Sequence, residues 1–69
     1  MITREQYKVL SMASGMEYMV TLPQIMNEQE DLRDLGFLDW SHDHPNHHSV
    51  IAYKITQAGR DELAKGPPT

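Results

Sequence analysis

The chain has 69 residues, of which six are Lys or Arg and ten are Asp or Glu, so its formal net charge is −4. A chain of this length forms one domain at most, without room for a cleft between two lobes. It contains no cysteine, which excludes disulfides and thiolate metal sites, and no apolar run approaches the length of a membrane span. Because the sequence also lacks a secretory signal pattern, we expect a cytoplasmic protein with no membrane partner.

The first predicted element is a helix that begins after Thr3 and ends at Gly15. Thr3 and Gln6 have the spacing of a capping box, in which each side chain bonds to the other residue's backbone N–H. One apolar stripe follows at a spacing of three: Tyr7, Leu10 and Ala13. We expect Gly15 to stop the helix in a left-handed conformation. Residues 16–20 are predicted to be a short extended connector or a single distorted turn.

A second helix is predicted over residues 21–36. Thr21 and Gln24 form another possible capping box, Pro23 is tolerated in a first helical turn, and Gly36 ends the helix. The predicted inward face consists of four apolar residues: Leu22, Ile25, Met26 and Leu32. Methionines are adaptable gap-fillers, so four of them are predicted to fill the core: Met12, Met16, Met19 and Met26.

Two strand-like runs follow, FLDW at residues 37–40 and SVIAYKI at residues 49–55. The polar loop between them makes this a hairpin with a long tip, and we expect Trp40 and Tyr53 to pack across its strands. Thr56 can cap a last short helix, in which Leu63 and Ala64 point inward and Gly66 stops the helix. The predicted domain covers residues 1–66, followed by a tail at residues 67–69.

The stretch LRDLGFLDW…YKITQAGRDEL resembles the second half of a winged helix-turn-helix domain of the multiple-antibiotic-resistance type of regulator. The matching residues are Leu32, Leu35, Gly36, Leu38, Ile55, Thr56, Gly59, Arg60 and Leu63. The resemblance implies a small α+β, winged-helix-like fold with a recognition helix, a β-hairpin wing and a short C-terminal helix. Residues 16–20 are too few for the regular helix that normally precedes the recognition helix in that family.

The predicted outward face of the second helix is acidic. It carries Gln24, Asn27, Glu28, Glu30, Asp31 and Asp34. Gln24 and Asn27 have the side chains that read adenine, but DNA phosphates would repel the four carboxylates beside them. Such a face is either a plain solvated surface or a docking surface for a basic protein, and opposite charge would speed the encounter with that partner.

The hairpin tip is rich in imidazole and has neither Lys nor Arg. It carries His42, His44, His47 and His48. Imidazole and carboxylate suit zinc or nickel, yet this spacing matches no known zinc motif, so exposed histidines without metal are favoured. Their protonation near pH 6.5 would make the charge of the tip, and binding through it, depend on pH.

No motif predicts catalysis. Ser41 and His42 are adjacent, which by itself makes no nucleophile–base pair, and no glycine-rich phosphate loop or cofactor motif occurs. We therefore predict a non-catalytic binding protein, an acidic adaptor or inhibitor and a monomer or weak dimer. Its predicted binding residues are the acidic face, Trp40 and the four histidines. In size and charge it resembles phage and mobile-element accessory proteins such as anti-CRISPR inhibitors. The alternatives are a winged-helix DNA-binding regulator and a metal-responsive regulator.

Overall fold

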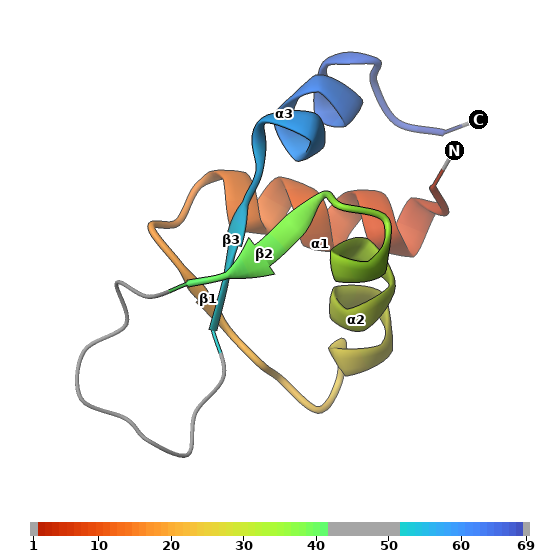
Figure 1. Ribbon diagram of the computed structural model, residues 1–69. Coiled ribbons are helices and arrows are strands. Elements are labelled where there is room, and N and C mark those ends of the chain that lie inside the picture. The colour runs from red at the N-terminus through yellow and green to blue at the C-terminus, as the bar shows by residue number, and fades with distance from the viewer. Residues whose placement is uncertain (1, 42–51, 69) are drawn as a thin grey trace.

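A computed structural model describes residues 2–41 and 52–68 of the chain (Figure 1). In this part the chain forms three helices and one three-stranded antiparallel sheet, so the α+β class is confirmed. The elements in chain order are α1 (Arg4–Ser14), β1 (Met19–Val20), α2 (Met26–Asp34), β2 (Leu38–Trp40), β3 (Ala52–Ile55) and α3 (Gln57–Ala64). Within these residues no helix is long and apolar enough to cross a membrane.

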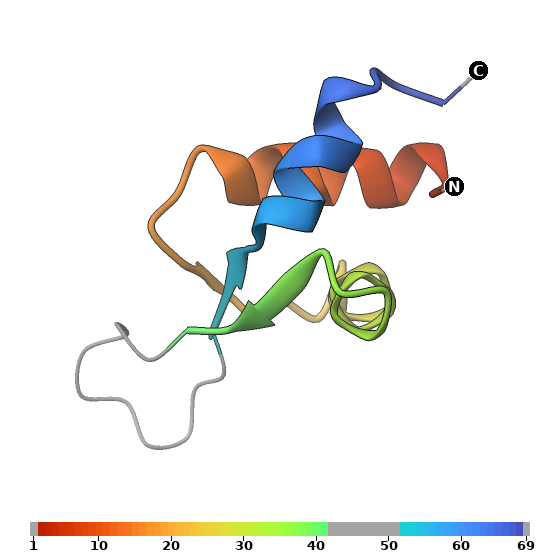
Figure 2. The same ribbon diagram turned by 45° about the horizontal axis from the view of Figure 1, so that its top comes forward.

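The sheet has the strand order β1-β3-β2, with the last strand of the sequence in the middle. Met19 pairs with Tyr53 on one side, and Trp40 pairs with Tyr53 on the other. The connector at residues 16–20 therefore begins with a bend and is extended at its end, which forms a third strand that the sequence did not indicate. Helix α1 packs against α2, α3 and β3 and lies across the sheet (Figures 1 and 2).

The predicted start of α1 is confirmed. The helix also ends at Gly15 as predicted, but the left-handed conformation predicted for Gly15 is wrong. The Thr3 hydroxyl accepts the backbone N–H of Gln6 at 3.1 Å, and the Gln6 side chain accepts the N–H of Thr3 at 2.9 Å. Gly15 caps the other end with φ −94°, which is not left-handed, and its N–H donates to carbonyls of the preceding turn. The helix ends without needing the conformational freedom of glycine.

Helix α2 begins at Met26, five residues later than the predicted cap at Thr21. The Ile25 N–H donates to the Leu22 carbonyl at 3.0 Å, so residues 22–25 form a turn. Pro23 occupies the second position of that turn, which its fixed φ suits. The proline that is tolerated in a first helical turn here stabilises a turn before the helix instead.

This late start changes which apolar residues are buried. Leu32 is fully buried, but Leu22 precedes the helix and is 36% exposed, and Met26 is 41% exposed. The prediction of a methionine-filled core is also wrong for Met12 and Met16, which are about half exposed, whereas Met19 is buried. The core is formed by Ile2, Val9, Leu10, Ala13, Met19, Leu32, Leu38, Tyr53 and Ile55.

A tight joint connects the end of α2, the start of β2 and the start of α3. Gly36 has φ +85°, and the N–H groups of Gly36 and Phe37 donate back to the carbonyls of Arg33 and Leu32, which is a Schellman motif. The Thr56 hydroxyl donates to the Gly36 carbonyl at 2.7 Å and accepts the Gly59 N–H at 3.0 Å. The same hydroxyl therefore caps α3 and holds it to the end of α2.

Glycine at position 59 is required by the closeness of this joint. A Cβ there would lie 2.4 Å from the Phe37 carbonyl oxygen and 2.8 Å from an Ile55 side-chain carbon. At the far end of α3, Gly66 adopts φ +87°, consistent with the predicted stop. Leu63 packs against the core as predicted, but Ala64 is exposed because it lies past the inward side of this short helix.

Candidate functional site

The outward side of α2 is set by the residues that the helix buries. Gln29 and Leu32 are both fully buried, so the opposite side of the helix faces solvent. The predicted residues that lie on this side and are exposed are Asn27, Glu30, Asp31 and Asp34. Glu28 lies at the margin and is half-buried, and Gln24 is exposed but belongs to the preceding turn. The structure therefore places four of the six predicted residues together on one helix face.

Two of these carboxylates already have partners in the chain. The Gln6 side-chain amide donates to Asp31 at 3.2 Å, which links the start of α1 to the middle of α2. Arg33 forms an ion pair with Asp34 at 3.3 Å, but both side chains are solvated, so the pair contributes little stability. Glu30 is also exposed and adds a third carboxylate to the same face. The face is acidic and partly fixed in position.

Trp40 lies beside this face, on β2. Its ring stacks on Tyr53 with 5.1 Å between ring centroids, so the predicted cross-strand packing is confirmed. The Arg33 guanidinium lies over the Trp40 ring, 5.0 Å from the ring centroid. Trp40 nevertheless remains 39% exposed. An arginine from α2 and two aromatic rings from the hairpin thus form one continuous stack, which sequence spacing alone did not predict.

Charged side chains of α2 lie near the phenol of Tyr53 in the hairpin. Burial raises the pKa of the Tyr53 phenol above its ordinary value. The positive charge of Arg33 opposes this rise in pKa, whereas the negative charges of Glu30 and Asp34 add to it. These three side chains therefore influence the ring on which Trp40 rests.

Two exposed apolar side chains flank the acidic face. Met26 lies at the first residue of α2, and Leu35, which is 52% exposed, follows its last residue. We use the name α2–Trp40 surface for the exposed residues Met26, Asn27, Glu30, Asp31, Asp34, Leu35 and Trp40. Its mixture of apolar, aromatic and charged groups is that of a surface which can bind another macromolecule by packing and charge together.

The sequence analysis missed one residue that shapes this site, the buried Gln29. Its side-chain amide donates to the Val20 carbonyl at 3.0 Å, and its side-chain oxygen accepts the Leu22 N–H at 3.1 Å. The signal was present, since Ile25, Gln29 and Leu32 have the spacing of one helix face. A polar residue in that pattern indicates a buried amide with specific partners.

The four predicted histidines, His42, His44, His47 and His48, lie outside the described residues. Their part in binding metal, protons or a partner therefore stays a prediction. Among residues 2–41 and 52–68, no group of histidine, aspartate and glutamate side chains is arranged to hold a metal ion. The described part of the chain also contains no pocket.

Comparisons with protein-family models, with curated proteins and with solved structures find no match to this chain.

Proposed function

We propose that this protein is a non-catalytic binding protein, an acidic adaptor or inhibitor that docks on a basic protein through the α2–Trp40 surface. The observation that carries the proposal is the composition of α2. The helix has four carboxylates and one basic residue, Arg33, which is itself paired with Asp34 and stacked on Trp40. Such a surface attracts cations and repels phosphate.

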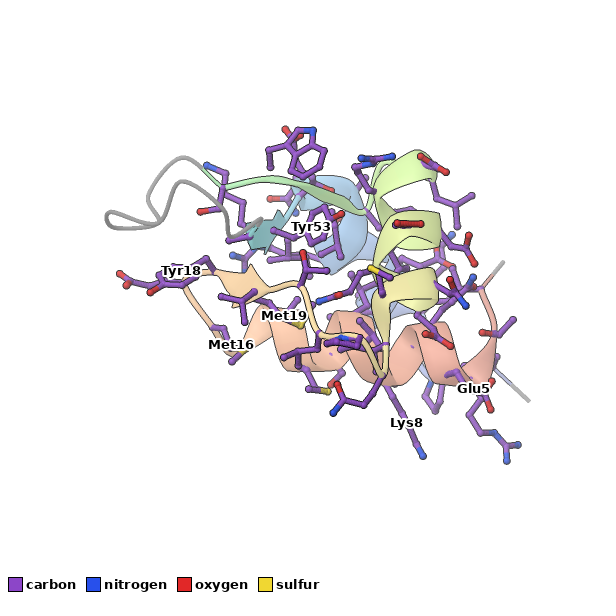
Figure 3. The ribbon with its side chains drawn as sticks, turned by 90° about the horizontal axis from the view of Figure 1, so that it is seen from below. Glu5, Lys8, Met16, Tyr18, Met19 and Tyr53 are labelled. Atoms are coloured by element: carbon purple, nitrogen blue, oxygen red, sulfur yellow. The ribbon has the colours of Figure 1, made fainter. Side chains whose placement is uncertain are left out.

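The distribution of basic residues supports the same proposal. Lys8 lies on the side of α1 that faces away from α2, together with Glu5 (Figure 3). Lys54 belongs to β3 and Arg60 to α3. Opposite charges across an interface accelerate association and suppress wrong partners. Trp40, with Arg33 and Tyr53 beside it, has the composition of an interface hot spot.

The second candidate is a winged-helix DNA-binding regulator. It is favoured by the order of α2, a hairpin and α3, and by the joint of Gly36, Thr56 and Gly59, where the residues of the sequence resemblance meet. On this hypothesis α2 is the recognition helix and the hairpin is the wing. The carboxylates of α2 argue against this candidate, because DNA affinity comes largely from neutralising phosphates. A metal-responsive form would depend on the histidines of the hairpin tip.

The protein-docking proposal is tested with three immobilised baits in lysate of the source organism. The first is the unaltered chain, and the second carries Glu30→Lys, Asp31→Lys and Asp34→Lys. The third carries the matched changes Glu5→Lys, Glu17→Lys and Asp61→Lys, which alter net charge equally at exposed positions outside α2. We expect a protein with a basic surface to be retained by the first and third baits and lost by the second. Equal retention by all three would contradict the proposal.

DNA binding is tested by fluorescence anisotropy of labelled mixed-sequence duplex at about 50 mM and about 200 mM salt. The docking proposal predicts no binding at either salt concentration. Binding at the lower concentration that weakens at the higher one would favour the regulator. In that case the three Lys substitutions on α2 would tighten non-specific DNA binding.

A further inference from the structure

Arg33 is the one basic residue of α2, and two groups hold its guanidinium. The guanidinium carbon lies 5.0 Å from the centroid of the Trp40 ring, and Nη2 lies 3.3 Å from Oδ1 of Asp34. The Trp40 ring is itself stacked on Tyr53, a core residue that is 3% exposed and supports it. An aromatic face attracts a cation, and a carboxylate accepts the N–H groups of that cation. These residues therefore form a guanidinium-binding site, in which an arginine of the same chain lies.

The contacts that hold Arg33 in this site are of kinds that contribute little stability. Arg33 and Asp34 are neighbours along α2, and adjacent side chains on a helix do not face each other, so the guanidinium reaches the carboxylate from the side. The Asp34 side chain is 69% exposed and that of Arg33 is 35% exposed, so water screens the pair. A cation–π contact near the surface is also weak. Another cation can therefore replace Arg33 at small cost.

The site carries more negative charge than Arg33 neutralises. Glu30 precedes Asp34 by one helical turn, so the two carboxylates lie on the same side of α2. Both charges, and that of Arg33, act on the phenol of Tyr53, which places all three side chains near the aromatic rings. In the part of the chain that the structure describes, no side chain forms an ion pair or a hydrogen bond with the Glu30 carboxylate. A cation from another molecule is therefore attracted to the place that Arg33 occupies.

We propose that this site binds an arginine side chain of the basic partner, which replaces Arg33 over the Trp40 ring. The proposal rests on the protein-docking function above and specifies which partner side chain the surface selects. The entering guanidinium stacks on the indole and donates to Asp34 and Glu30, while Arg33 turns toward solvent. Arg33 is then an internal competitor, which only a side chain that binds the ring and the carboxylates together displaces. Lysine is disfavoured, since its ammonium is strongly hydrated and lacks a planar group that stacks on a ring.

The probe for this proposal is an acetylated hexapeptide amide of alternating glycine and arginine. It is compared with the same peptide in which lysine replaces arginine, so that the two probes have equal charge. Each is titrated into the isotope-labelled, full-length protein at about 50 mM salt, where surface charges are weakly screened. Affinities are obtained from the backbone amide signals. Trp40 is the only tryptophan of the chain, so its indole N–H signal reports on the site without ambiguity.

We expect the unaltered chain to bind the arginine peptide roughly threefold more tightly than the lysine peptide. The arginine peptide should also move the Nε–H signal of Arg33 to the position of a solvated arginine, because the guanidinium leaves the ring current of the indole. Trp40→Leu should abolish the preference for arginine.

The competitor itself is tested by a substitution that keeps net charge. Arg33→Lys leaves a cation at the same position but one that stacks more weakly on the ring, so the arginine peptide should bind roughly twofold more tightly. Arg60→Lys is the matched control, at an exposed position on α3, and should leave this affinity unchanged. A change in charge cannot explain a difference between these two variants.

Equal affinity of the unaltered chain for the two peptides would overturn the arginine site, as would binding of neither peptide. Weaker binding of the arginine peptide by Arg33→Lys would also overturn it, because Arg33 would then assist the partner. The three-bait experiment distinguishes this failure from that of the docking proposal. Retention of a basic protein that depends on the α2 carboxylates would show that docking persists without a site for arginine.

Discussion

The two outer strands of this sheet are finished in different ways. At β1 the outward carbonyl of Val20, and the Leu22 N–H just beyond the strand, are bonded by Gln29, a fully buried amide that belongs to another element. At β2 the outward N–H of Trp40 is bonded by Asp39, an exposed carboxylate one residue away. Exposed strand edges are sites at which other chains pair, and native proteins protect them with charge or coverage. The difference is that a buried side chain covers the edge at β1, whereas an exposed side chain bonds the Trp40 amide at β2.

The comparison predicts its largest effect at Gln29. Gln29→Leu keeps the volume but leaves the Val20 carbonyl and the Leu22 N–H without partners in a partly buried place. We expect a loss of about 3 kcal/mol in the free energy of unfolding, measured by urea denaturation. The control is Gln24→Leu at an exposed position, with little expected change. Similar stabilities of the two variants would show that Gln29 does not close the β1 edge.

A smaller loss of stability is expected from a change at Gly59, which lies close to Phe37, the residue before β2. In Gly59→Ala the new methyl group meets the Phe37 carbonyl, so α3 or the start of β2 must shift. Overpacking of this kind costs about 2 kcal/mol, to be measured by thermal unfolding. Gly15→Ala is the matched control, because a Cβ there meets nothing nearer than 3.7 Å and φ is negative. If Gly59→Ala unfolds at the same temperature as the unaltered chain, the joint does not fix the position of β2.

The central strand β3 provides a pH-dependent test through Tyr53. Since burial raises the pKa of its phenol above 10.0, the unfolded chain loses this proton at lower pH than the folded chain. The contribution of Tyr53 to stability is thus complete below pH 10 and falls as pH rises further. We compare the free energies of unfolding of Tyr53→Phe and of the unaltered chain. Their difference should be constant from about pH 7 to pH 9, and at pH values above about 10 it should change in favour of Tyr53→Phe. A constant difference over the whole range would contradict the assignment.

The smallest effect on stability is expected at Asp39. Asp39→Ala removes an exposed local hydrogen bond, so we expect a change within about 0.5 kcal/mol. The same variant should exchange the Trp40 amide hydrogen faster, because that group loses its acceptor. A loss of stability as large as that of Gln29→Leu would show that the Asp39 hydrogen bond stabilises the β2 edge as strongly as Gln29 stabilises the β1 edge.

The elements that the sequence predicted well are those fixed by neighbouring residues. The capping box of Thr3 and Gln6, the stop at Gly36 and the cap at Thr56 each involve residues within a few positions of one another. The pairing of Trp40 with Tyr53 was also predictable, because strand alternation on both sides of one hairpin sets it. Such signals need no knowledge of the rest of the fold.

The parts that could not be predicted depend on contacts between distant segments. Strand β1 has two residues, and it is a strand because Met19 lies opposite Tyr53. The start of α2 was predicted too early because Thr21, Pro23 and Gln24 suit a helix start as well as the turn that they precede or form. In the candidate site, the contacts of Arg33 with Trp40 and of Gln6 with Asp31 each join two elements.

The hydroxyl of Thr56 has a consequence for local opening of the protein. It donates to Gly36, two residues after the end of α2, and accepts from Gly59 in α3, so neither helix end can come apart without removing a partner from the other. Native-state hydrogen exchange would then report the two ends as one cooperative unit, with the Phe37 and Gly59 amides opening together. A ligand bound at α2 would slow exchange at α3 through this atom, at a distance of twenty residues along the chain.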